Sequence, residues 1–180
     1  MKVLIVGAGG RRYPLALALS KSKYVSEIYC APGNAGIAQI ATLVPIKETD
    51  VEALKAFAIK QKIDLTVVGP EMALAAGIVD EFNAAGLKIF GPTKKAAEIE
   101  TSKSYAKDLM KKYHIPTASY EVFTDYEKAI NYVRGHSLPI VLKYDGLAAG
   151  KGVVIATTLE EAEETLKDML IDEEFGSSSV

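Results

Sequence analysis

The sequence has 180 residues and a net charge of −2, with 49% hydrophobic and 24% charged residues. This composition excludes an intrinsically disordered chain, and the near-neutral charge argues against a broad nucleic-acid surface. The single cysteine, Cys30, cannot form an internal disulfide. The apolar run at residues 3–6 is too short for a signal peptide, and no stretch is long enough to cross a bilayer. We therefore expect a globular cytoplasmic protein with no nucleic-acid or membrane partner.

Short apolar runs alternate with helical patterns in the first half of the chain. Asp50 is the expected N-cap of one helix, and Pro14 fits another helix only in its first turn. Strands that alternate with helices predict an α/β fold with a doubly wound parallel sheet, in a domain at residues 1–92. The predicted strands are 3–6, 26–30, 65–68 and 87–90, and the predicted helices are 11–20, one from 51 onward, and 71–85.

The pattern changes after residue 92, where we place the start of a second domain at residues 93–180. A glycine-rich loop at 144–152 joins two of its predicted strands. The capping-box spacings Thr124-x-x-Glu127 and Thr158-x-x-Glu161 each predict the start of a helix. The remaining elements expected here are a helix at 101–113 and strands at 120–123, 139–143 and 153–156.

The first glycine cluster, Gly7-Ala8-Gly9-Gly10, follows the first strand but does not complete a dinucleotide-binding fingerprint. Arg12 stands where the third glycine is needed, and the second strand ends without an acidic residue for a ribose. A nicotinamide or flavin site is therefore disfavoured. A glycine turn before a helix favours an anionic group, usually phosphate, and Arg11 adds a cation there. The alternative is a tight strand-to-helix turn that binds no ligand.

Two other strands end in turn-forming clusters, at 32–36 and 69–71. Each cluster can be a plain turn, or a backbone site for an anion. Ligands of doubly wound sheets collect at the carboxyl ends of the strands, so the shared location favours binding. The candidate residues of these clusters are Pro32, Gly33, Asn34, Gly36, Gly69, Pro70 and Glu71.

The glycine-rich loop at 144–152 does not match the Walker A phosphate-binding motif. It has one spacer residue too few, Gly152 replaces the serine or threonine that holds magnesium, and a strand follows instead of a helix. A glycine-rich turn with Lys143 and Lys151 at its ends suggests a flap over a triphosphate. The alternative is a hairpin tip without a ligand.

These stretches together resemble the glycinamide ribonucleotide synthetase (phosphoribosylamine–glycine ligase) family of ATP-grasp enzymes. The resemblance covers the whole chain, in family order, and the motif at residues 143–153 is its most specific part. It implies a pre-ATP-grasp domain followed by the beginning of an ATP-grasp module. It also implies a purine-biosynthesis ligase that joins glycine to 5-phosphoribosylamine through a glycyl phosphate, with ATP and Mg²⁺. The matching stretches are 3–11, 31–36, 64–71, 86–93, 102–107 and 143–153.

The resemblance also implies residue roles. The phosphoribosylamine would lie at Gly9, Gly10 and Arg11 and at the two other strand-end clusters. The family's metal ligands lie further along its chain than Val180, so we expect no metal site here and an N-terminal fragment inactive by itself. The residues that would contact the ATP phosphates are Lys103, Lys143, Asp145, Gly146, Gly150, Lys151 and Gly152.

The sequence departs from the family after Arg11. Arg12, Tyr13 and Pro14 stand where the family usually has Glu-His-Ala, so that a cation replaces a carboxylate beside the expected substrate. This departure favours an alternative function, a non-catalytic module that binds a phosphosugar or a protein partner. The lysine–glycine motif at residues 143–153 favours the ligase and weakens a third possibility, another ATP-grasp ligase or a carboxylase subunit.

Overall fold

The computed structural model describes residues 1–148 and 152–172 and divides the chain into two compact units, Met1–Glu98 and Ile99–Val180. The expected domain limit at residue 92 stays a prediction. In the structure the division falls inside helix α5 (Lys94–Thr101). The backbone N–H of Lys94 donates to the carboxylate of Asp80 at 2.7 Å, which attaches the start of this helix to the first unit.

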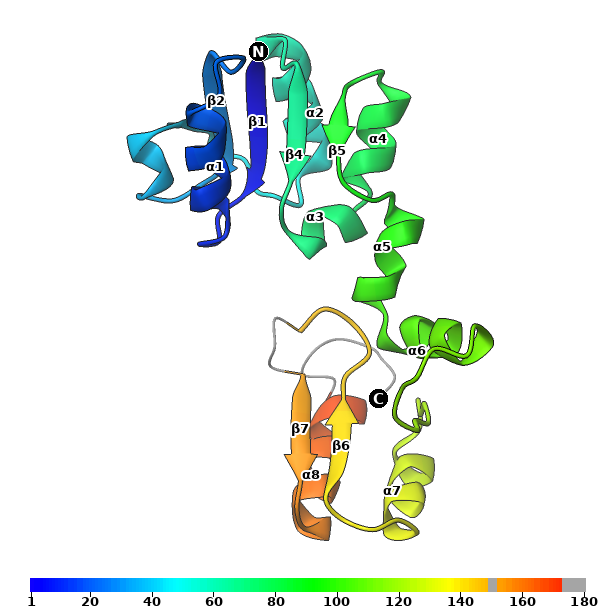
Figure 1. The fold of residues 1–180 in the computed structure, drawn as a ribbon. Helices are drawn as coiled ribbons and strands as arrows, with labels where there is room; N and C mark the ends of the chain where they lie inside the picture. Colours follow the sequence, from blue (N-terminus) through cyan, green and yellow to red (C-terminus); the bar gives the residue numbers. More distant parts are fainter. Residues whose placement is uncertain (149–151, 173–180) are drawn as a thin grey trace. The chain divides into compact units, whose positions relative to one another are not determined.

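The first unit is built on a five-stranded parallel sheet in the order β3-β2-β1-β4-β5 (Figure 1). This order confirms the predicted doubly wound sheet. In the register, Gly7 lies opposite Pro32 and Val6 lies opposite Val68, so the glycine-containing clusters that follow β1, β2 and β4 begin at the same edge. The strands are β1 (Lys2–Gly7), β2 (Glu27–Pro32), β3 (Thr42–Leu43), β4 (Leu65–Val68) and β5 (Ile89–Phe90).

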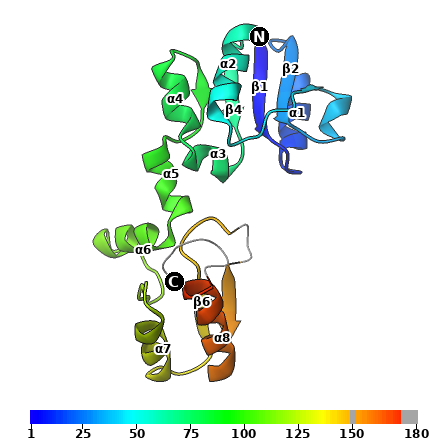
Figure 2. The ribbon, with the colours of Figure 1, turned by 180° about the vertical axis from the view of Figure 1, so that it is seen from behind.

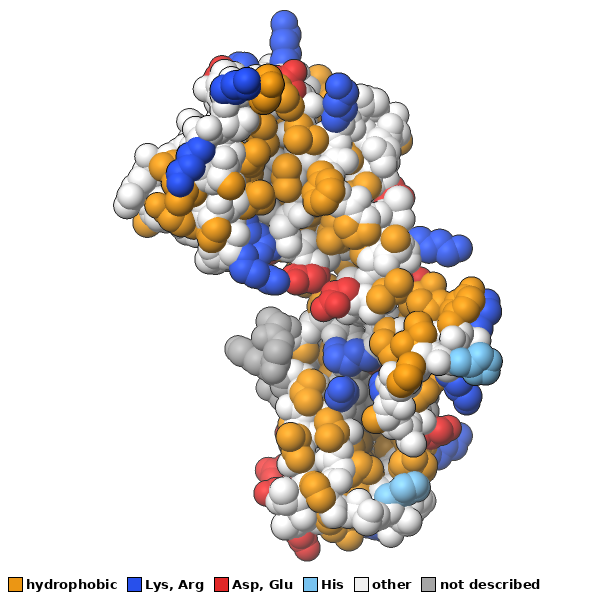
Figure 3. Space-filling view, viewed as in Figure 1, with side chains coloured by type: hydrophobic (Ala, Val, Ile, Leu, Met, Phe, Trp, Pro, Cys, Tyr) orange, Lys and Arg blue, Asp and Glu red, His pale blue; other side chains and the backbone are white. Residues whose placement is uncertain are grey.

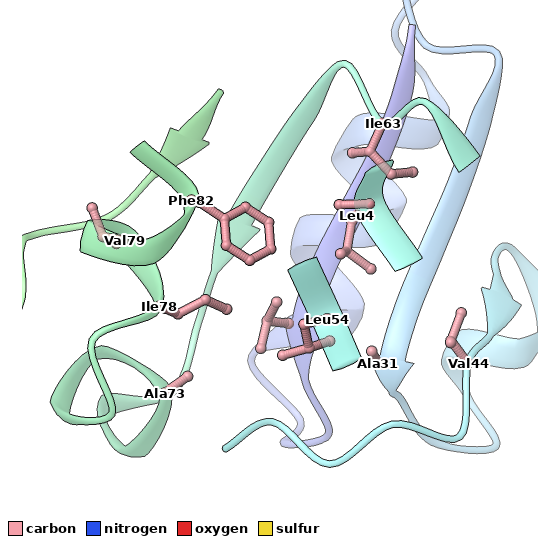
Figure 4. Close-up of a cluster of buried hydrophobic side chains, with 11 residues drawn as sticks. Leu4, Ala31, Val44, Leu54, Ile63, Ala73, Ile78, Val79 and Phe82 are labelled. Atoms are coloured by element: carbon pink, nitrogen blue, oxygen red, sulfur yellow. The ribbon is translucent and has the colours of Figure 1, made fainter. Parts of the chain in front are cut away.

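Alternate residues of β1 face two hydrophobic clusters on opposite sides of the sheet. Leu4 and Val6 pack with side chains of α2 (Val51–Gln61) and α4 (Ile78–Ala84), and the ring of Phe82 lies among them (Figure 4). Val3 and Ile5 pack on the other side with α1 (Arg12–Ser20) and the 3₁₀ turn η1 (Ile37–Gln39). Because β1 is covered on both faces, its run of apolar residues is continuous.

The helix predicted at residues 71–85 is wrong in one respect, because the structure breaks it in two. Helix α3 (Glu71–Ala75) ends near Gly77, which precedes α4 and has a φ of +87°. A left-handed residue cannot continue an α-helix, and glycine adopts this conformation without a steric penalty. Two local expectations are confirmed: Asp50 caps α2 through the N–H of Ala53 at 3.1 Å, and Pro14 lies in the first turn of α1.

The second unit consists of an antiparallel hairpin, β6 (Ile140–Lys143) and β7 (Val153–Ala156), with helices on one face (Figures 1 and 2). Residues of α7 (Tyr126–Arg134) and α8 (Leu159–Leu170) form a cluster with the inward side chains of the hairpin. The opposite face presents exposed hydrophobic side chains to solvent (Figure 3). These are Val141, Val153 and Ile155, with exposed fractions of 50%, 44% and 63%.

Three predictions for the second unit are corrected by the structure. Residues 120–123 form no strand, because no neighbouring strand pairs with them in the described part of the chain. The cap of α7 is Asp125, which accepts the N–H of Lys128 at 2.9 Å, and not Thr124. The helix predicted from residue 101 begins at Lys103 as α6 (Lys103–Lys112), after the separate helix α5. The capping box at Thr158 is confirmed.

Candidate functional site

The loops after β1 and β2 are tied together at the carboxyl edge of the sheet. The side-chain amide of Asn34 donates to the carbonyl oxygen of Ala8 at 2.6 Å, and its carbonyl oxygen accepts the N–H of Ile37 at 3.1 Å. Both ends of the Asn34 side chain are therefore used inside the protein. Asn34 fixes the position of the glycine turn at residues 7–10, which is a structural task that its place in a turn cluster did not reveal.

Glu71 brings the loop after β4 to the same edge. Its carboxylate accepts a hydrogen bond from the guanidinium of Arg11, at 3.2 Å. The backbone N–H of Glu71 itself, at the start of α3, is the main cause that lowers the pKa of this carboxyl, and Arg11 adds to the effect. Glu71 is thus an anion at neutral pH and partly neutralises the cations of the edge.

The backbone at the start of α1 contributes little to an anion site. The N–H of Arg12 donates to the carbonyl of Gly9 at 2.9 Å, and the N–H of Tyr13 donates to the carbonyl of Gly10 at 3.2 Å. Pro14, at the third helical position, has no N–H. The first three helical residues therefore leave no free N–H for a ligand, and full positive charge at this edge comes from the side chains of Arg11 and Arg12.

Arg12 supplies such a charge from inside the protein. Its side chain is 5% exposed and lies against the backbone of β1 and β4. A Cβ atom at Gly69 would lie 2.7 Å from the guanidinium carbon, and one at Gly7 would lie 2.8 Å from Nε, so the two glycines make room for it. Nε of Arg12 is buried and has no hydrogen-bond partner among residues 1–148 and 152–172.

In the sequence, Arg12 interrupts a glycine fingerprint and places a cation where the resembling family usually has a carboxylate. The one available signal was an arginine directly beside Arg11 in a glycine-rich turn. That signal does not say which of two neighbouring arginines points inward, because burial depends on Gly69, which lies 57 positions away along the chain.

Cys30 is also buried at this edge, and its thiol donates to the carbonyl of Gly7 at 3.3 Å. Burial raises the pKa of the thiol to about 11, against a smaller opposite effect of the Arg12 charge. The thiolate is the reactive form of cysteine, so Cys30 is inert near neutral pH. Cys30 packs in the same hydrophobic cluster as Val3 and Ile5.

In the second unit, Asp145 connects the glycine-rich loop to the start of α6. Its carboxylate accepts the backbone N–H of Lys103 at 2.5 Å and that of Ser104 at 3.2 Å. The hydroxyls of Ser102 and Ser104 also donate to this carboxylate. A carboxylate at a helix N-terminus satisfies unpaired N–H groups and interacts favourably with the helix dipole.

Lys103 makes a second connection to the same loop. Its ammonium group donates to the carbonyl oxygen of Gly146 at 2.8 Å. Gly146 has a φ of +146°, and a Cβ there would lie 2.8 Å from the ring of Tyr144, so glycine suits this position on both counts. Gly152 is confined in the same way, since a Cβ would lie 2.7 Å from that of Ala148.

Lys143 is exposed on β6 and belongs to the side of the hairpin that α7 and α8 leave uncovered. Leu142, the residue before it, points into the cluster of buried side chains on the other face. Strand alternation therefore directs Lys143 to the same side as Val141. The predicted residues Gly150 and Lys151 lie outside the described residues.

The structure thus brings together the predicted substrate residues within the first unit, and Lys103, Asp145 and Gly146 within the second. Within the described ranges, no group of three His, Cys, Asp or Glu side chains is placed to hold a metal ion. None of the helices in the same ranges combines the length and the hydropathy of a membrane span.

Two family models match the chain and together cover its full length. The N domain of phosphoribosylglycinamide synthetase matches residues 1–100, and the ATP-grasp (A) domain of the same family matches residues 101–180.

Curated relatives agree with these matches. Phosphoribosylamine–glycine ligase from Halalkalibacterium halodurans is 55% identical over 99% of this chain, and that from Escherichia coli K12 is 53% identical over 99%. The chain spans 42% of the length of each of these relatives.

Solved structures agree as well. Phosphoribosylamine–glycine ligase from Thermotoga maritima matches with a TM-score of 0.78 and 32% identity, over 99% of this chain and 42% of that one. The biotin carboxylase domain of 2-oxoglutarate carboxylase from Hydrogenobacter thermophilus matches with a TM-score of 0.76 over 99% of this chain and 43% of that one. Its identity of 16% indicates a shared fold alone.

Proposed function

The chain belongs to the phosphoribosylglycinamide synthetase family, and from this premise we propose that it works in the ligase that joins glycine to 5-phosphoribosylamine. In that reaction the γ-phosphate of ATP is transferred to the carboxylate of glycine, which gives glycyl phosphate and ADP. The amine of phosphoribosylamine then attacks the acyl carbon, and inorganic phosphate leaves. The product is glycinamide ribonucleotide.

In this proposal the first unit holds the phosphoribosylamine at the carboxyl edge of its sheet. Arg11 is exposed there and can turn from Glu71 toward a phosphate, since exposed ion pairs are weak. The remaining contacts come from the clusters at 9–10, 32–36 and 69–71. Asn34 holds the glycine turn against the cluster at 32–36, so its contribution is to position these two parts of the substrate site.

The second unit binds the phosphates of ATP. Lys143 lies on the uncovered side of the hairpin, where an ammonium group can approach a polyphosphate. Lys103 is held at the carbonyl of Gly146 and can exchange this neutral acceptor for a charged phosphate oxygen, which forms a stronger hydrogen bond. Phosphoryl transfer needs mainly positioning and neutralisation of charge, and lysines of this kind supply both. Magnesium would add to the neutralisation, but the described residues offer no ligand set for it.

The observation that carries this proposal is the end-to-end match of two domains of one ligase family, at residues 1–100 and 101–180. A chimera tests it. Residues 1–180 of this chain replace the corresponding part of the Escherichia coli relative, which is 53% identical over the matched region. We expect the purified chimera to release ADP only when glycine and phosphoribosylamine are both present.

Lys143→Met in the chimera should abolish ADP release, because it removes a cation from the polyphosphate site. Lys21→Gln, an exposed charge at the end of α1, is the matched control and should leave the rate unchanged. A folded chimera that binds ribose 5-phosphate but releases no ADP would contradict the ligase function and favour the non-catalytic, phosphosugar-binding module.

A further inference from the structure

Arg12 is a buried cation that the family resemblance does not use. We propose that its guanidinium binds the phosphate group of a sugar phosphate at the carboxyl ends of β1 and β4. The identity of the sugar phosphate rests on the proposed function. The anion site itself is argued from the contacts of Arg12.

The charge of Arg12 is only partly offset within the described part of the chain, by the nearby carboxylate of Glu71. Arg12 is a cationic residue that is 5% exposed. The ion pairs found within residues 1–148 and 152–172 do not include Arg12, and its Nε has no hydrogen-bond partner there. A buried charge without a partner costs free energy. An anion that enters beside Arg12 offsets part of this cost, which favours its binding.

The backbone N–H groups of the first three residues of α1 are not available to an anion beside Arg12. The N–H groups of Arg12 and Tyr13 are engaged in the glycine turn, and Pro14 has none. Gly7 and Gly69 carry no side chains, so the guanidinium lies directly on the backbone at the strand ends. An oxyanion at this edge can therefore accept from the fixed fork of Arg12 and from the exposed guanidinium of Arg11, beside the N–H groups of the glycine turn at residues 9–11.

Phosphate fits this pair better than a carboxylate does. A phosphate monoester carries a charge of about −1.5 to −2 near neutral pH and has three acceptor oxygens. It can accept a bidentate contact from Arg12 and still have an oxygen for Arg11. A carboxylate has two oxygens and one charge, which a single arginine fork already satisfies. In the proposed substrate, 5-phosphoribosylamine, phosphate is also the anionic group.

Replacement of Arg12 distinguishes a structural role from a binding role by its effects on stability and on affinity. If Arg12 served only the fold, its replacement would lower the stability of the free protein and would not act on ligands. If Arg12 binds an anion, a neutral residue in its place removes an incompletely compensated buried charge from the free protein and weakens the binding of the anion. Residues kept for function at the expense of stability behave in the second way.

The experiment measures binding and stability on the 180-residue chain. Ribose 5-phosphate and inorganic phosphate are titrated separately by calorimetry at low salt, and the melting temperature of each free variant is recorded. Arg12→Gln should weaken ribose 5-phosphate at least about tenfold, as expected for loss of a charge-assisted bidentate contact. It should leave the melting temperature of the free chain unchanged or raise it.

Two further variants complete the test. Lys21→Gln removes an exposed positive charge from the other end of α1 and should change the affinity by less than about twofold. Arg12→Lys keeps the charge but loses the fork, so it should bind with intermediate affinity. This variant also serves if Arg12→Gln does not fold.

The outcomes separate this inference from the proposed function. Unchanged affinity in Arg12→Gln overturns the anion site, and so does an equal loss in Lys21→Gln. Unchanged affinity in Arg12→Lys overturns the bidentate contact. Displacement of ribose 5-phosphate by acetate but not by inorganic phosphate overturns the assignment to phosphate. If inorganic phosphate and ribose 5-phosphate bind equally well and both need Arg12, the anion site is supported and the sugar-phosphate substrate is contradicted.

Discussion

Replacement of Asp145 tests how the glycine-rich loop is held on the second unit. The carboxylate of Asp145 accepts two backbone N–H groups at the start of α6, those of Lys103 and Ser104, from 41 to 42 positions away in the sequence. Asp145→Ala leaves these N–H groups without this acceptor and removes a negative charge from a helix N-terminus. Helix caps contribute about 0.5–2 kcal/mol and the dipole interaction about 0.3–1 kcal/mol. For this half-buried group we expect a loss of about 2 kcal/mol, in the middle of the combined range.

Amide hydrogen exchange measures this loss at the place where it occurs. Since each 1.4 kcal/mol corresponds to a factor of ten, a loss of about 2 kcal/mol should speed exchange at Lys103 and Ser104 about thirtyfold. Asp145→Asn keeps an acceptor oxygen but not the charge, and should have a smaller effect.

Asp125→Ala is the matched control for this experiment. It removes an N-cap carboxylate from α7, where the bonded N–H belongs to Lys128, three positions away. We expect faster exchange at α7 and no change at Lys103 and Ser104. Unchanged exchange at the start of α6 in Asp145→Ala, or an equal effect of Asp125→Ala at that place, would refute the role of Asp145 as the anchor of the loop.

Three further predictions concern the first unit. Leu54→Ala should lower the free energy of unfolding by about 3 kcal/mol in urea titrations, because this fully buried side chain would leave a cavity, whereas Ile59→Ala on the exposed side of α2 should have little effect. Iodoacetamide at pH 8 should modify Cys30 only after the chain unfolds, because burial and a thiol pKa of about 11 protect it; modification of the native chain would contradict this. The lowered pKa of Glu71 means that its contribution to stability is present above its ordinary value of 4.5 and is lost as the pH falls further. Glu71→Gln should therefore make unfolding less dependent on pH below about 4.5, and an unchanged acid profile would contradict the lowered pKa of Glu71, whose main cause is the backbone N–H at the start of α3.

Local patterns were sufficient for most of the elements. The apolar run at residues 3–6 predicted a strand covered on both faces, since alternate side chains of a buried strand must meet two layers. Asp50 and Thr158 identified the starts of α2 and α8, because a cap acts on N–H groups two or three residues away. The lysine–glycine motif and the strand-end clusters marked the parts of the chain that resemble a ligase family.

Local patterns failed where the decision depended on distant contacts. A glycine inside a helical pattern can either continue the helix or break it, and the packing of α3 and α4 on the sheet decided that Gly77 breaks it. Residues 120–123 have a strand-like pattern but find no strand to pair with among the described residues, and a strand is stable only as part of a sheet. Asp145 could be expected near a phosphate, but only the folded chain showed that its carboxylate accepts N–H groups at the start of α6.

The burial of Arg12 at the candidate site also could not be predicted from local patterns. The sequence alone predicted β1, β2 and β4, the edge where they end and the presence of two neighbouring cations, because these follow from periodicity and from residue types close together in the chain. Only the tertiary structure decided that Arg11 lies outside against Glu71 while Arg12 lies inside against Gly7 and Gly69. The environment of a charge depends on every segment packed around it, and those segments come from β1, α1 and the end of β4.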